Sequence, residues 1–575
     1  MYSRLSVLIA FAALLLIPAT SVWAIDFDVA ASVDAIEADF ETQQIDADQA
    51  ALQIAFALFD NSRLQSRYHR AANAPKIRTS ELVGTSQCGT AEILKLRRIL
   101  QQASAAVRAQ VQKIMMPGTP RGVTLNAGKA LGHNPLGTEL PNNYYTEHFA
   151  IRWGDSYAAD TDTIEFWGQI LEDEIWDTEV VAWDYPDVYA SDTYYVDVYI
   201  GNSGSGAPII DFAGAYTTIY DDGSQWGEDG EYQPLIVFHP DLLAYESTIQ
   251  SVSAHEFFHT LQFTLAVNGE NYYIFDQNSL WWIEGTATWA SSVMYEDLND
   301  YVYYVYGWSQ EAFESLTKQG NGDEYGRVIW ARFLYEFHGG LDAIHEIWVN
   351  GSGTSALFGN AGYLKHQDME WDNAWVDFVQ QLLAESFEDN DVIPNFGDYR
   401  TVATFPYAQW EIDGNQQPHI NSVHKIMVRN GDETDPRLNI WFQPEDITLD
   451  GADWLLVAYK ETAAGDIEAQ VLDVSTKDAP YEFTIDGLGS TYDRIHLLIT
   501  PISSTEDNYI ASWDYMLQLT RGDDAFQEPP VGDDDTAGDD DTIGDDDDDD
   551  DDDTSGAQPG GDDDDDDDDG GGCGC

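Results

Sequence analysis

Residues 252–263 have the sequence VSAHEFFHTLQF. Apart from His255, Glu256 and His259, every side chain in this segment is small, apolar or uncharged, which indicates a buried helix. Side chains four positions apart lie on the same face of an α-helix, so the two histidines can present their imidazole nitrogens to one ion. The spacing therefore predicts a Zn²⁺ site on a helix over residues 251–263, with Glu256 alongside the metal.

The third ligand must come from further along the chain, because a catalytic zinc usually has three protein ligands and one water. A metzincin would need Gly at position 262 and His at position 265, and Gln262 and Leu265 occupy these positions. A carboxylate is the remaining choice. Glu284 fits best, since it lies in the apolar segment of residues 281–295, which has the length of a helix that could pack against the first. Three other acids compete for this role: Glu270, Asp276 and Asp297.

The segment around Glu284 resembles the gluzincin metallopeptidases, in which H-E-x-x-H is followed by a helix with a motif like W-x-x-E-G-x-A. The matching residues are Trp281, Glu284, Gly285 and Ala287. The resemblance implies Glu284 as the third metal ligand and a zincin-like catalytic domain. It also implies an edge strand that pairs with an extended substrate, for which residues 233–240 are the candidate.

A wider resemblance connects the layout to secreted metalloproteases of myxobacterial type. These have a Cys-Gly-Thr segment, a strand beginning His-Phe, an HEFFHTLQ helix, an EGTA-type helix and a β-sandwich. The matching residues are Cys88-Gly89-Thr90, His148-Phe149 and residues 255–262. The similarity covers most of residues 85–520, and only the zinc motifs in it are specific.

The implied activity is peptide hydrolysis. Zn²⁺ lowers the pKa of its bound water and polarises the scissile carbonyl, and Glu256 acts as the catalytic general base without binding the metal. Gluzincins use a further Tyr or His to stabilise the oxyanion. Three residues are available for this role here: Tyr325, His338 and His345.

Cys88 has two interpretations. A thiolate supplied by the N-terminal region could occupy the open position of the zinc and hold the enzyme latent, as cysteine switches do. The alternative is a buried cysteine without a redox or metal role. The first interpretation predicts that Cys88→Ser raises the activity of the unprocessed protein.

The 575-residue chain is strongly acidic, with a formal net charge of −77. Of its 103 acidic residues, 26 lie in residues 523–575, so the rest still has 77 acidic residues against 26 Lys and Arg. Such a charge repels phosphate groups and excludes nucleic-acid binding as the function. The three cysteines are too few for a disulfide scaffold, so stability must come from burial, to which 18 Trp, 31 Tyr and 24 Phe contribute.

The sequence predicts an α+β protein of several parts. A short apolar run follows Arg4 and ends near a small-residue cleavage site, which indicates export to the cell surface or the medium. No later segment has the apolar length of a transmembrane helix. Five parts follow: a signal peptide (1–24), a helical N-terminal region or propeptide (25–139), a zinc metallopeptidase catalytic domain (140–395), a β-sandwich (396–522) and a disordered Asp-rich tail (523–575).

Hydrophobic periodicity places elements within these parts. The N-terminal region is predicted to be helical over residues 33–68 and 90–116. In the catalytic domain we expect strands over residues 145–153, 194–200 and 234–239, and helices over residues 163–176 and 325–337 in addition to the two zinc helices. Seven short runs between residues 425 and 519, separated by turn signals, indicate the β-sandwich.

The Asp-rich tail indicates Ca²⁺ as a second cofactor and the cell surface as a second location. Its Asp runs supply carboxylates that suit Ca²⁺, although no Asp-x-Asp-x-Asp-Gly loop with a closing Glu is present. The GGGCGC ending resembles the start of a cysteine-bearing surface-sorting signal, which points to cell-surface attachment through the tail. The hydrophobic segment and basic end of such signals are missing.

Two other functions compete with a peptidase acting on protein or peptide substrates. One is a surface-binding or adhesion protein with a degenerate zincin domain, against which the intact Glu256 argues. The other is a zinc hydrolase acting on a non-peptide amide. Among peptidases, the lack of a G-x-M-E-N segment before the zinc helix favours an endopeptidase over the related aminopeptidases.

Overall fold

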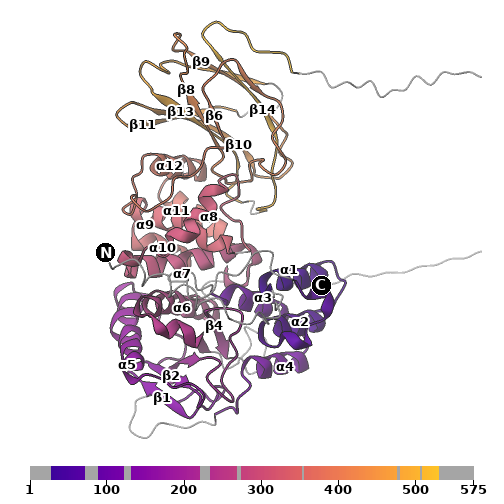
Figure 1. The fold of residues 1–575 in the computed structure, drawn as a ribbon, viewed down its shortest axis with the longest axis vertical. Helices are drawn as coiled ribbons and strands as arrows, with labels where there is room; N and C mark the ends of the chain where they lie inside the picture. The colour runs from indigo at the N-terminus through magenta and orange to yellow at the C-terminus, as the bar shows by residue number, and fades with distance from the viewer. Residues whose placement is uncertain are drawn as a thin grey trace, which may run out of the picture. The chain divides into compact units, whose positions relative to one another are not determined.

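A five-stranded mixed β-sheet carries the candidate site in the computed structural model (Figure 1). The structure describes residues 28–70, 88–121, 131–220, 233–268, 273–320, 322–351, 355–474, 480–505 and 508–529. The predicted signal peptide and most of the predicted Asp-rich tail lie outside these residues.

The sheet has the order β1-β2-β3-β5-β4. Its strands are β1 Asn142–Tyr145, β2 Phe149–Trp153, β3 Val196–Ile200, β4 Ala215–Tyr220 and β5 Gln233–Phe238. β2, β3 and β5 run parallel, while β1 and β4 form the two edges and pair antiparallel. Every residue of β3, β4 and β5 is buried, as expected for a sheet covered on both faces.

Two strand predictions need correction. Residues 145–153 do not form one strand, because a turn in which the Thr146 amide donates to the Phe149 carbonyl (3.1 Å) separates β1 from β2. Residues 233–240 were expected at the edge, but β5 lies inside the sheet between β3 and β4. The edge strand is β4, which the sequence analysis did not predict.

The two faces of the sheet belong to two hydrophobic cores. Successive strand residues point to opposite faces. One set packs with the helices that carry the histidines: Val198, Ile200, Ile219, Ile236 and Phe238. The other set packs with the N-terminal helices: Tyr199, Tyr216, Tyr220, Leu235 and Val237. The N-terminal helices therefore cover a face of the sheet that is apolar.

The predicted helical character of the N-terminal region is confirmed in its described part. The helices are α1 Val29–Glu41, α2 Ala47–Phe59, α3 Thr90–Leu100 and α4 Ala105–Met115, and short 3-10 turns η1 and η2 span Asn61–Arg63 and Ser66–Tyr68. Ser104 separates α3 from α4, since its hydroxyl accepts a hydrogen bond from the Val107 amide (3.4 Å) and caps the new helix. α3 is joined to the sheet by Arg97, whose guanidinium donates to Thr218 Oγ1 (3.1 Å) on β4.

The zinc-motif helix is longer than predicted. α6 spans Glu246–Val267, and 17 of its 22 residues are buried, which makes it a core helix rather than an amphipathic surface helix. α7, Leu280–Met294, packs against it. The predicted helix over residues 163–176 is α5, Thr161–Gln169, which continues as a π-helix, η4, over Ile170–Ala182. The predicted helix over residues 325–337 begins as the 3-10 turn η9, Asp323–Arg327, and continues as α9, Val328–Phe337.

Further helices complete this part of the chain. They are α8 Val302–Gln310, α10 Leu341–Val349, α11 Ala356–His366 and α12 Trp371–Leu383, with 3-10 turns η5 Pro240–Ala244, η6 Tyr273–Phe275, η7 Gln277–Ser279 and η8 Glu296–Leu298. No helix among the described residues combines the length and the apolar character needed to cross a membrane.

The C-terminal part consists of two sheets, of order β11-β10-β13-β8-β6 and β12-β9-β14-β7. The strands are β6 Arg400–Val402, β7 Tyr407–Gln409, β8 Lys425–Arg429, β9 Leu438–Pro444, β10 Asp453–Glu461, β11 Ile467–Leu472, β12 Tyr481–Ile485, β13 Arg494–Ile502 and β14 Tyr515–Arg521. The seven predicted runs correspond to β8 to β14, whereas β6 and β7 were not predicted. Buried side chains of both sheets form one cluster, which is the packing that the predicted sandwich requires.

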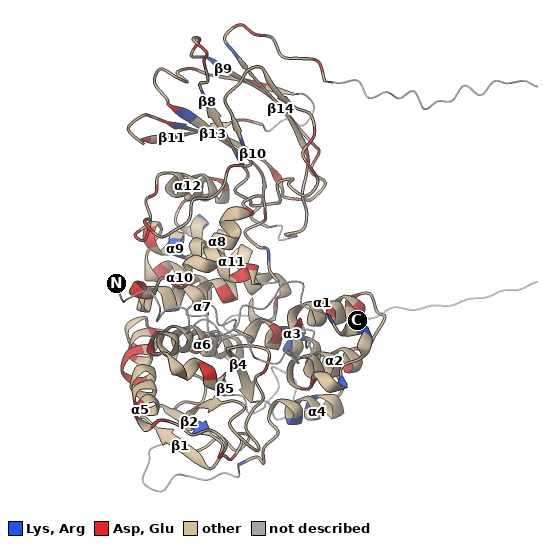
Figure 2. Cartoon of the chain, viewed as in Figure 1, with Lys and Arg blue, Asp and Glu red and all other residues tan. Residues whose placement is uncertain are grey.

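The described residues through Gln527 form one compact unit, so the predicted boundaries after residues 139 and 395 stay predictions. Figure 2 shows that Asp and Glu residues, coloured red, are spread over helices and strands throughout these residues. Two of the scarce basic residues pair inside the N-terminal helices: Lys95 Nζ lies 2.7 Å from Asp34 Oδ1, and Arg98 pairs with Glu37. These two pairs therefore lie within the N-terminal helices, whereas Arg97 joins α3 to the sheet.

Candidate metal site

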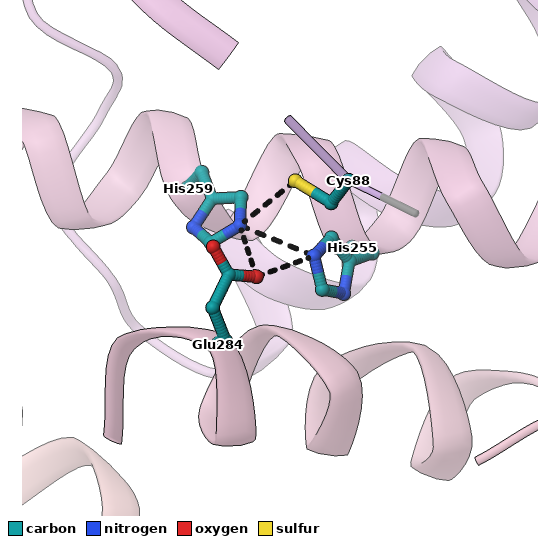
Figure 3. A group of neighbouring side chains, drawn as sticks. All are labelled: Cys88, His255, His259 and Glu284. Carbon is teal, nitrogen blue, oxygen red and sulfur yellow. Dashed lines mark hydrogen bonds and ion pairs between the residues drawn. The ribbon is translucent and has the colours of Figure 1, made fainter. Parts of the chain in front are cut away.

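Four side chains from three elements converge beside β4 (Figure 3). His255 and His259 come from α6, Glu284 from α7, and Cys88 from the residues immediately before α3. One ligand atom from each lies within 4.8 Å of all the others. A group of two imidazoles, a carboxylate and a thiol at this spacing could hold a metal ion.

The two histidines have the predicted arrangement on one face of α6. Their Nε2 atoms are 3.1 Å apart, and both residues are buried or nearly so. Glu284 Oε2 lies 3.2 Å from His255 Nε2 and 3.3 Å from His259 Nε2. α7 thus brings Glu284 to the imidazole pair, as the spacing and the motif predicted.

Gln262 fixes the orientation of the His259 ring. Its amide nitrogen donates to the Ile283 carbonyl (3.0 Å), so its oxygen Oε1 accepts, and His259 Nδ1 lies 2.7 Å from that oxygen. Nδ1 is therefore the protonated nitrogen, and Nε2 points its lone pair into the cluster. Gln262, one of the two residues that distinguish this chain from a metzincin, thus orients the His259 ring.

The cluster brings a carboxylate, two imidazoles and a thiol close together in the protein interior. Burial and the nearby carboxylates of Glu256 and Glu284 raise the pKa of the Cys88 thiol. Although burial acts in the opposite sense, His259 and His255 lower the pKa of Glu284 to about 2, and Glu284 in turn raises the pKa of His259. A bound cation would satisfy the carboxylate and both imidazoles at once.

Glu256 lies beside the cluster and outside it. Its side chain is fully buried, and Oε2 lies 2.7 Å from the Thr217 hydroxyl on β4 and 3.2 Å from the Thr90 hydroxyl at the start of α3. The other oxygen, Oε1, has no hydrogen-bond partner among the described residues. The carboxylate is thus oriented by two threonines while one oxygen remains available.

Cys88 reaches the cluster because its segment pairs with the sheet edge. Cys88 forms a parallel bridge with Ala215, and the Gly89 amide donates to the Ala215 carbonyl (2.7 Å). The Thr217 amide donates to Thr90 Oγ1 (2.8 Å). These contacts place Cys88 Sγ at 3.6 Å from His259 Nε2. The buried, free thiol of Cys88 thus lies beside the three candidate ligands.

Gly89 is required by the closeness of this pairing. A Cβ atom at position 89 would lie 2.3 Å from Phe212 Cε2 and 2.8 Å from the Ala213 Cβ. Both separations are below van der Waals contact. A side chain at this position would displace either the segment or the residues beneath it.

Of the three candidates for a further polar group, only Tyr325 lies at the cluster. Its hydroxyl donates to the Cys88 carbonyl (2.8 Å), and its ring centroid is 6.0 Å from that of His255. Burial and the nearby Glu284 raise the pKa of Tyr325 well above its ordinary value, so it remains a hydroxyl donor. His338 instead pairs with Asp377, and His345 with the Asp184 carbonyl.

Of the competing third ligands, Asp276 and Asp297 do not join the cluster. Asp276 accepts from Ser279 Oγ, Asp297 is exposed in η8, and Glu270 lies outside the described residues. Residues that sequence reasoning missed are Thr90, Thr217 and the positioning role of Gln262. For Thr217 a signal existed, since AYTTIY has the aromatic and β-branched composition of a strand.

Comparison with known proteins adds no assignment, because neither a family model nor a curated protein sequence matches this chain. The candidate metal site is therefore identified by its own donor atoms: two imidazole nitrogens, one carboxylate oxygen and one thiol sulfur, all within 4.8 Å of one another.

Proposed function

We propose that the chain is a zinc-dependent peptidase of the gluzincin type, with His255, His259 and Glu284 as metal ligands and Glu256 as general base. The single observation that carries the proposal is the convergence of Glu284 from a second helix on the two histidines of H-E-x-x-H. Nitrogen and sulfur donors favour zinc over Mg²⁺ and Ca²⁺, which take oxygen ligands.

The donor spacing fits zinc. Ligands at about 2.0 to 2.3 Å from a tetrahedral zinc lie roughly 3.3 to 3.6 Å from one another. The nitrogen-to-nitrogen and nitrogen-to-oxygen distances of 3.1, 3.2 and 3.3 Å and the sulfur-to-nitrogen distance of 3.6 Å are close to these values. The two imidazoles and the carboxylate thus have nearly the spacing of a zinc coordination shell, while the four donors together lie within 4.8 Å of one another.

Zinc, when bound, supplies Lewis acidity that lowers the pKa of a water and polarises a carbonyl. The protein supplies the proton transfer. Glu256 accepts the proton of the attacking water, and the free Oε1 is the oxygen available for it. Glu256 then returns this proton to the leaving amine, while the Thr217 hydroxyl holds its other oxygen.

Tyr325 is the proposed oxyanion donor. In the structure its hydroxyl already donates to a backbone carbonyl, that of Cys88, beside the metal ligands. A substrate carbonyl in the same place would receive the same hydrogen bond, which strengthens as negative charge develops on the oxygen.

An extended peptide backbone suits the edge of the sheet. β4 has one side paired with β5, and its other side lies beside the cluster, where Ala215 and Thr217 use their backbone groups to bind residues 89 and 90. Strand addition at such an edge binds any extended peptide through its main chain. This supports a peptide substrate over a small amide, and the missing G-x-M-E-N segment supports internal cleavage.

The location of the enzyme is part of the proposal. The predicted signal peptide over residues 1–24 supports a secreted or surface-attached protein, and the Asp-rich tail supplies loose Ca²⁺ binding and a route to surface attachment. A zincin-like catalytic domain and a C-terminal β-sandwich complete the proposed architecture.

The test compares Glu256→Gln with Glu246→Gln, an exposed residue of the same helix. Both variants are made in the Cys88→Ala background, because Cys88 lies at the metal ligands. Cleavage of casein and of a quenched peptide library is measured with and without a chelator, together with zinc content. We expect cleavage that is lost with chelator and with Glu256→Gln, and is kept with Glu246→Gln. Full cleavage by Glu256→Gln would refute the proposed mechanism.

A second candidate function rests on Cys88. Four protein donors close a zinc site, and closed sites are usually structural. In that case the chain is a binding or adhesion protein that is stabilised by zinc without catalysis. Zinc-dependent thermal stability, with no cleavage in either cysteine background, is the result that this candidate predicts.

A further inference from the structure

We propose that residues 88–90 are a built-in inhibitor of the enzyme, which occupies the metal, the general base, the oxyanion donor and the substrate strand at the same time. This inference rests on the proposed peptidase function. It differs from a lone cysteine near a metal site because four separate contacts, made by three consecutive residues, involve four different parts of the machinery.

The first contact is with the metal ligands. Cys88 Sγ lies 3.6 Å from His259 Nε2, on the side of the cluster that the histidines and Glu284 leave open (Figure 3). The Thr90 amide donates to the same sulfur (3.3 Å), which fixes its position at the cluster. With Cys88 as fourth ligand, no corner remains for water.

The second contact is with the general base. The Thr90 hydroxyl lies 3.2 Å from Glu256 Oε2 and donates to it, because the same hydroxyl oxygen accepts from the Thr217 amide. The inhibitor segment therefore occupies one oxygen of the proton acceptor as well as lying at the metal ligands.

The third and fourth contacts are those of a substrate backbone. The Cys88 carbonyl accepts from the Tyr325 hydroxyl at 2.8 Å, and the Gly89 amide donates to the Ala215 carbonyl on the edge strand. The chain turns into α3 at Thr90, so only the residues around Gly89 run along the strand. The segment fills the position expected for a scissile peptide with a unit whose side chain binds the metal.

Helix α3, which follows residues 88–90 directly, holds the inhibitor segment against β4. Arg97 donates to Thr218 Oγ1 and to the Ile219 carbonyl on β4, and Leu96 is fully buried in the core shared with the sheet. Release of Cys88 breaks one sulfur-to-metal bond, leaves that corner to a water molecule and gives the thiolate one proton from solvent. No electron is transferred, so no oxidant or reductant is needed.

The experiment uses the full chain loaded with Co²⁺ and with Zn²⁺. Three variants are compared with the wild type: Cys88→Ala, Gly89→Ala, which keeps the thiol but cannot seat against Phe212 and Ala213, and Leu96→Ala, which loosens α3 without touching the cluster. The measurements are metal content, the thiolate-to-cobalt charge-transfer band and cleavage of a quenched peptide library. Circular dichroism checks the fold of each variant.

We expect the charge-transfer band in the wild type and its loss in Cys88→Ala, with metal content unchanged and cleavage raised at least tenfold. Gly89→Ala is expected to weaken the band and to raise cleavage several-fold, and Leu96→Ala, which loosens the helix that holds the segment, to change both in the same direction by a smaller amount. Absence of the band in the wild type, or equal cleavage by wild type and Cys88→Ala, would overturn the inhibitor while leaving the peptidase intact. A normal band with no cleavage by any variant would instead overturn the peptidase function, and the inhibitor with it.

Discussion

The two sides of the metal cluster are built differently. His255, His259 and Glu284 stand on α6 and α7, whose packing belongs to the core on one face of the central sheet. Cys88 lies directly before α3, a helix that contributes Ala91 and Leu94 to the same core and Ile93, Leu96, Ile99 and Leu100 to the core on the other face. Three donors thus stand on two helices packed in one core, and the fourth stands beside a helix that contacts both cores. If residues 88–90 are an inhibitor, the fourth donor is exchangeable while the other three stay in place.

The largest expected effect is the loss of zinc on changing one of the three donors His255, His259 and Glu284, which form the three-donor side of the cluster. Replacing Glu284 with Ala removes one of the three proposed ligands. Loss of a residue that only hydrogen-bonds to a ligand typically lowers metal affinity by roughly 10-fold to 100-fold, so the loss of Glu284 should lower zinc affinity by more than this. Cleavage in the Cys88→Ala background should be lost. Zinc content after dialysis measures the effect, with Asp297→Ala, an exposed acid, as control. Retention of zinc at full occupancy would show that Glu284 is no ligand.

Tyr325→Phe removes the hydroxyl that donates to the Cys88 carbonyl, on a ring that lies beside His255. Loss of an oxyanion donor typically lowers kcat by about 100-fold to 1000-fold. We expect this loss in the Cys88→Ala background with KM little changed, since the missing hydrogen bond matters most in the transition state. Steady-state kinetics on one peptide separates kcat from KM. An equal change in KM alone would assign Tyr325 to substrate binding.

Gln262→Leu tests how the three-donor side is oriented. Without the amide oxygen the His259 ring loses the acceptor for its Nδ1 proton. Zinc affinity should fall by about 10-fold to 100-fold, while the fold is retained because Leu matches the buried surroundings. Competition with a chelator of known affinity gives the value. An unchanged affinity would mean that packing alone orients the ring.

The stability of the folded protein should depend on pH through two buried acids, Glu92 and Glu324. Burial and the nearby charge of Glu324 raise the pKa of Glu92 on α3 to about 8, and burial and the charge of Glu284 raise that of Glu324 in η9 to about 7, with Lys95 acting against the shift in both. Because both folded values lie above the ordinary value of 4.5, the folded state binds more protons, and stability falls as the pH rises from about 4.5 to 8. One pKa unit corresponds to about 1.4 kcal/mol, so a loss of several kcal/mol is expected over this range.

The double variant Glu92→Gln with Glu324→Gln should flatten this decline. Urea unfolding at several pH values between 5 and 9 measures it, and Glu41→Gln, an exposed residue of α1, is the control. A decline of the same size in the double variant would place its origin elsewhere in this acidic chain.

The three-donor side was largely predictable from sequence, and the other side was not. A spacing of four on an apolar helix defines a shared face, so His255 and His259 followed from periodicity alone, and Glu284 followed from a motif in a second apolar helix. Thr90, two residues after Cys88, contacts Glu256 across 166 residues of sequence, and no periodicity encodes that contact. Cys88 was considered as a zinc ligand only because a thiolate can bind zinc, and not because of its position in the sequence.

The sheet shows the same limit. β5 was predicted but placed at the edge, because a buried apolar strand gives no sign of its neighbours in the sheet. The real edge, β4, was passed over although its composition is that of a strand. The break between β1 and β2 depends on a three-residue turn that an apolar pattern cannot show.

The covalent attachment of residues 88–90 to the rest of the protein has a consequence for how the enzyme would be studied. An inhibitor on the same chain has a fixed local concentration, typically in the millimolar range for short connections, and it does not fall when the sample is diluted. Cleavage per molecule should thus be equally low at nanomolar and micromolar protein. Only a change within the molecule, and not the removal of a partner, would raise it.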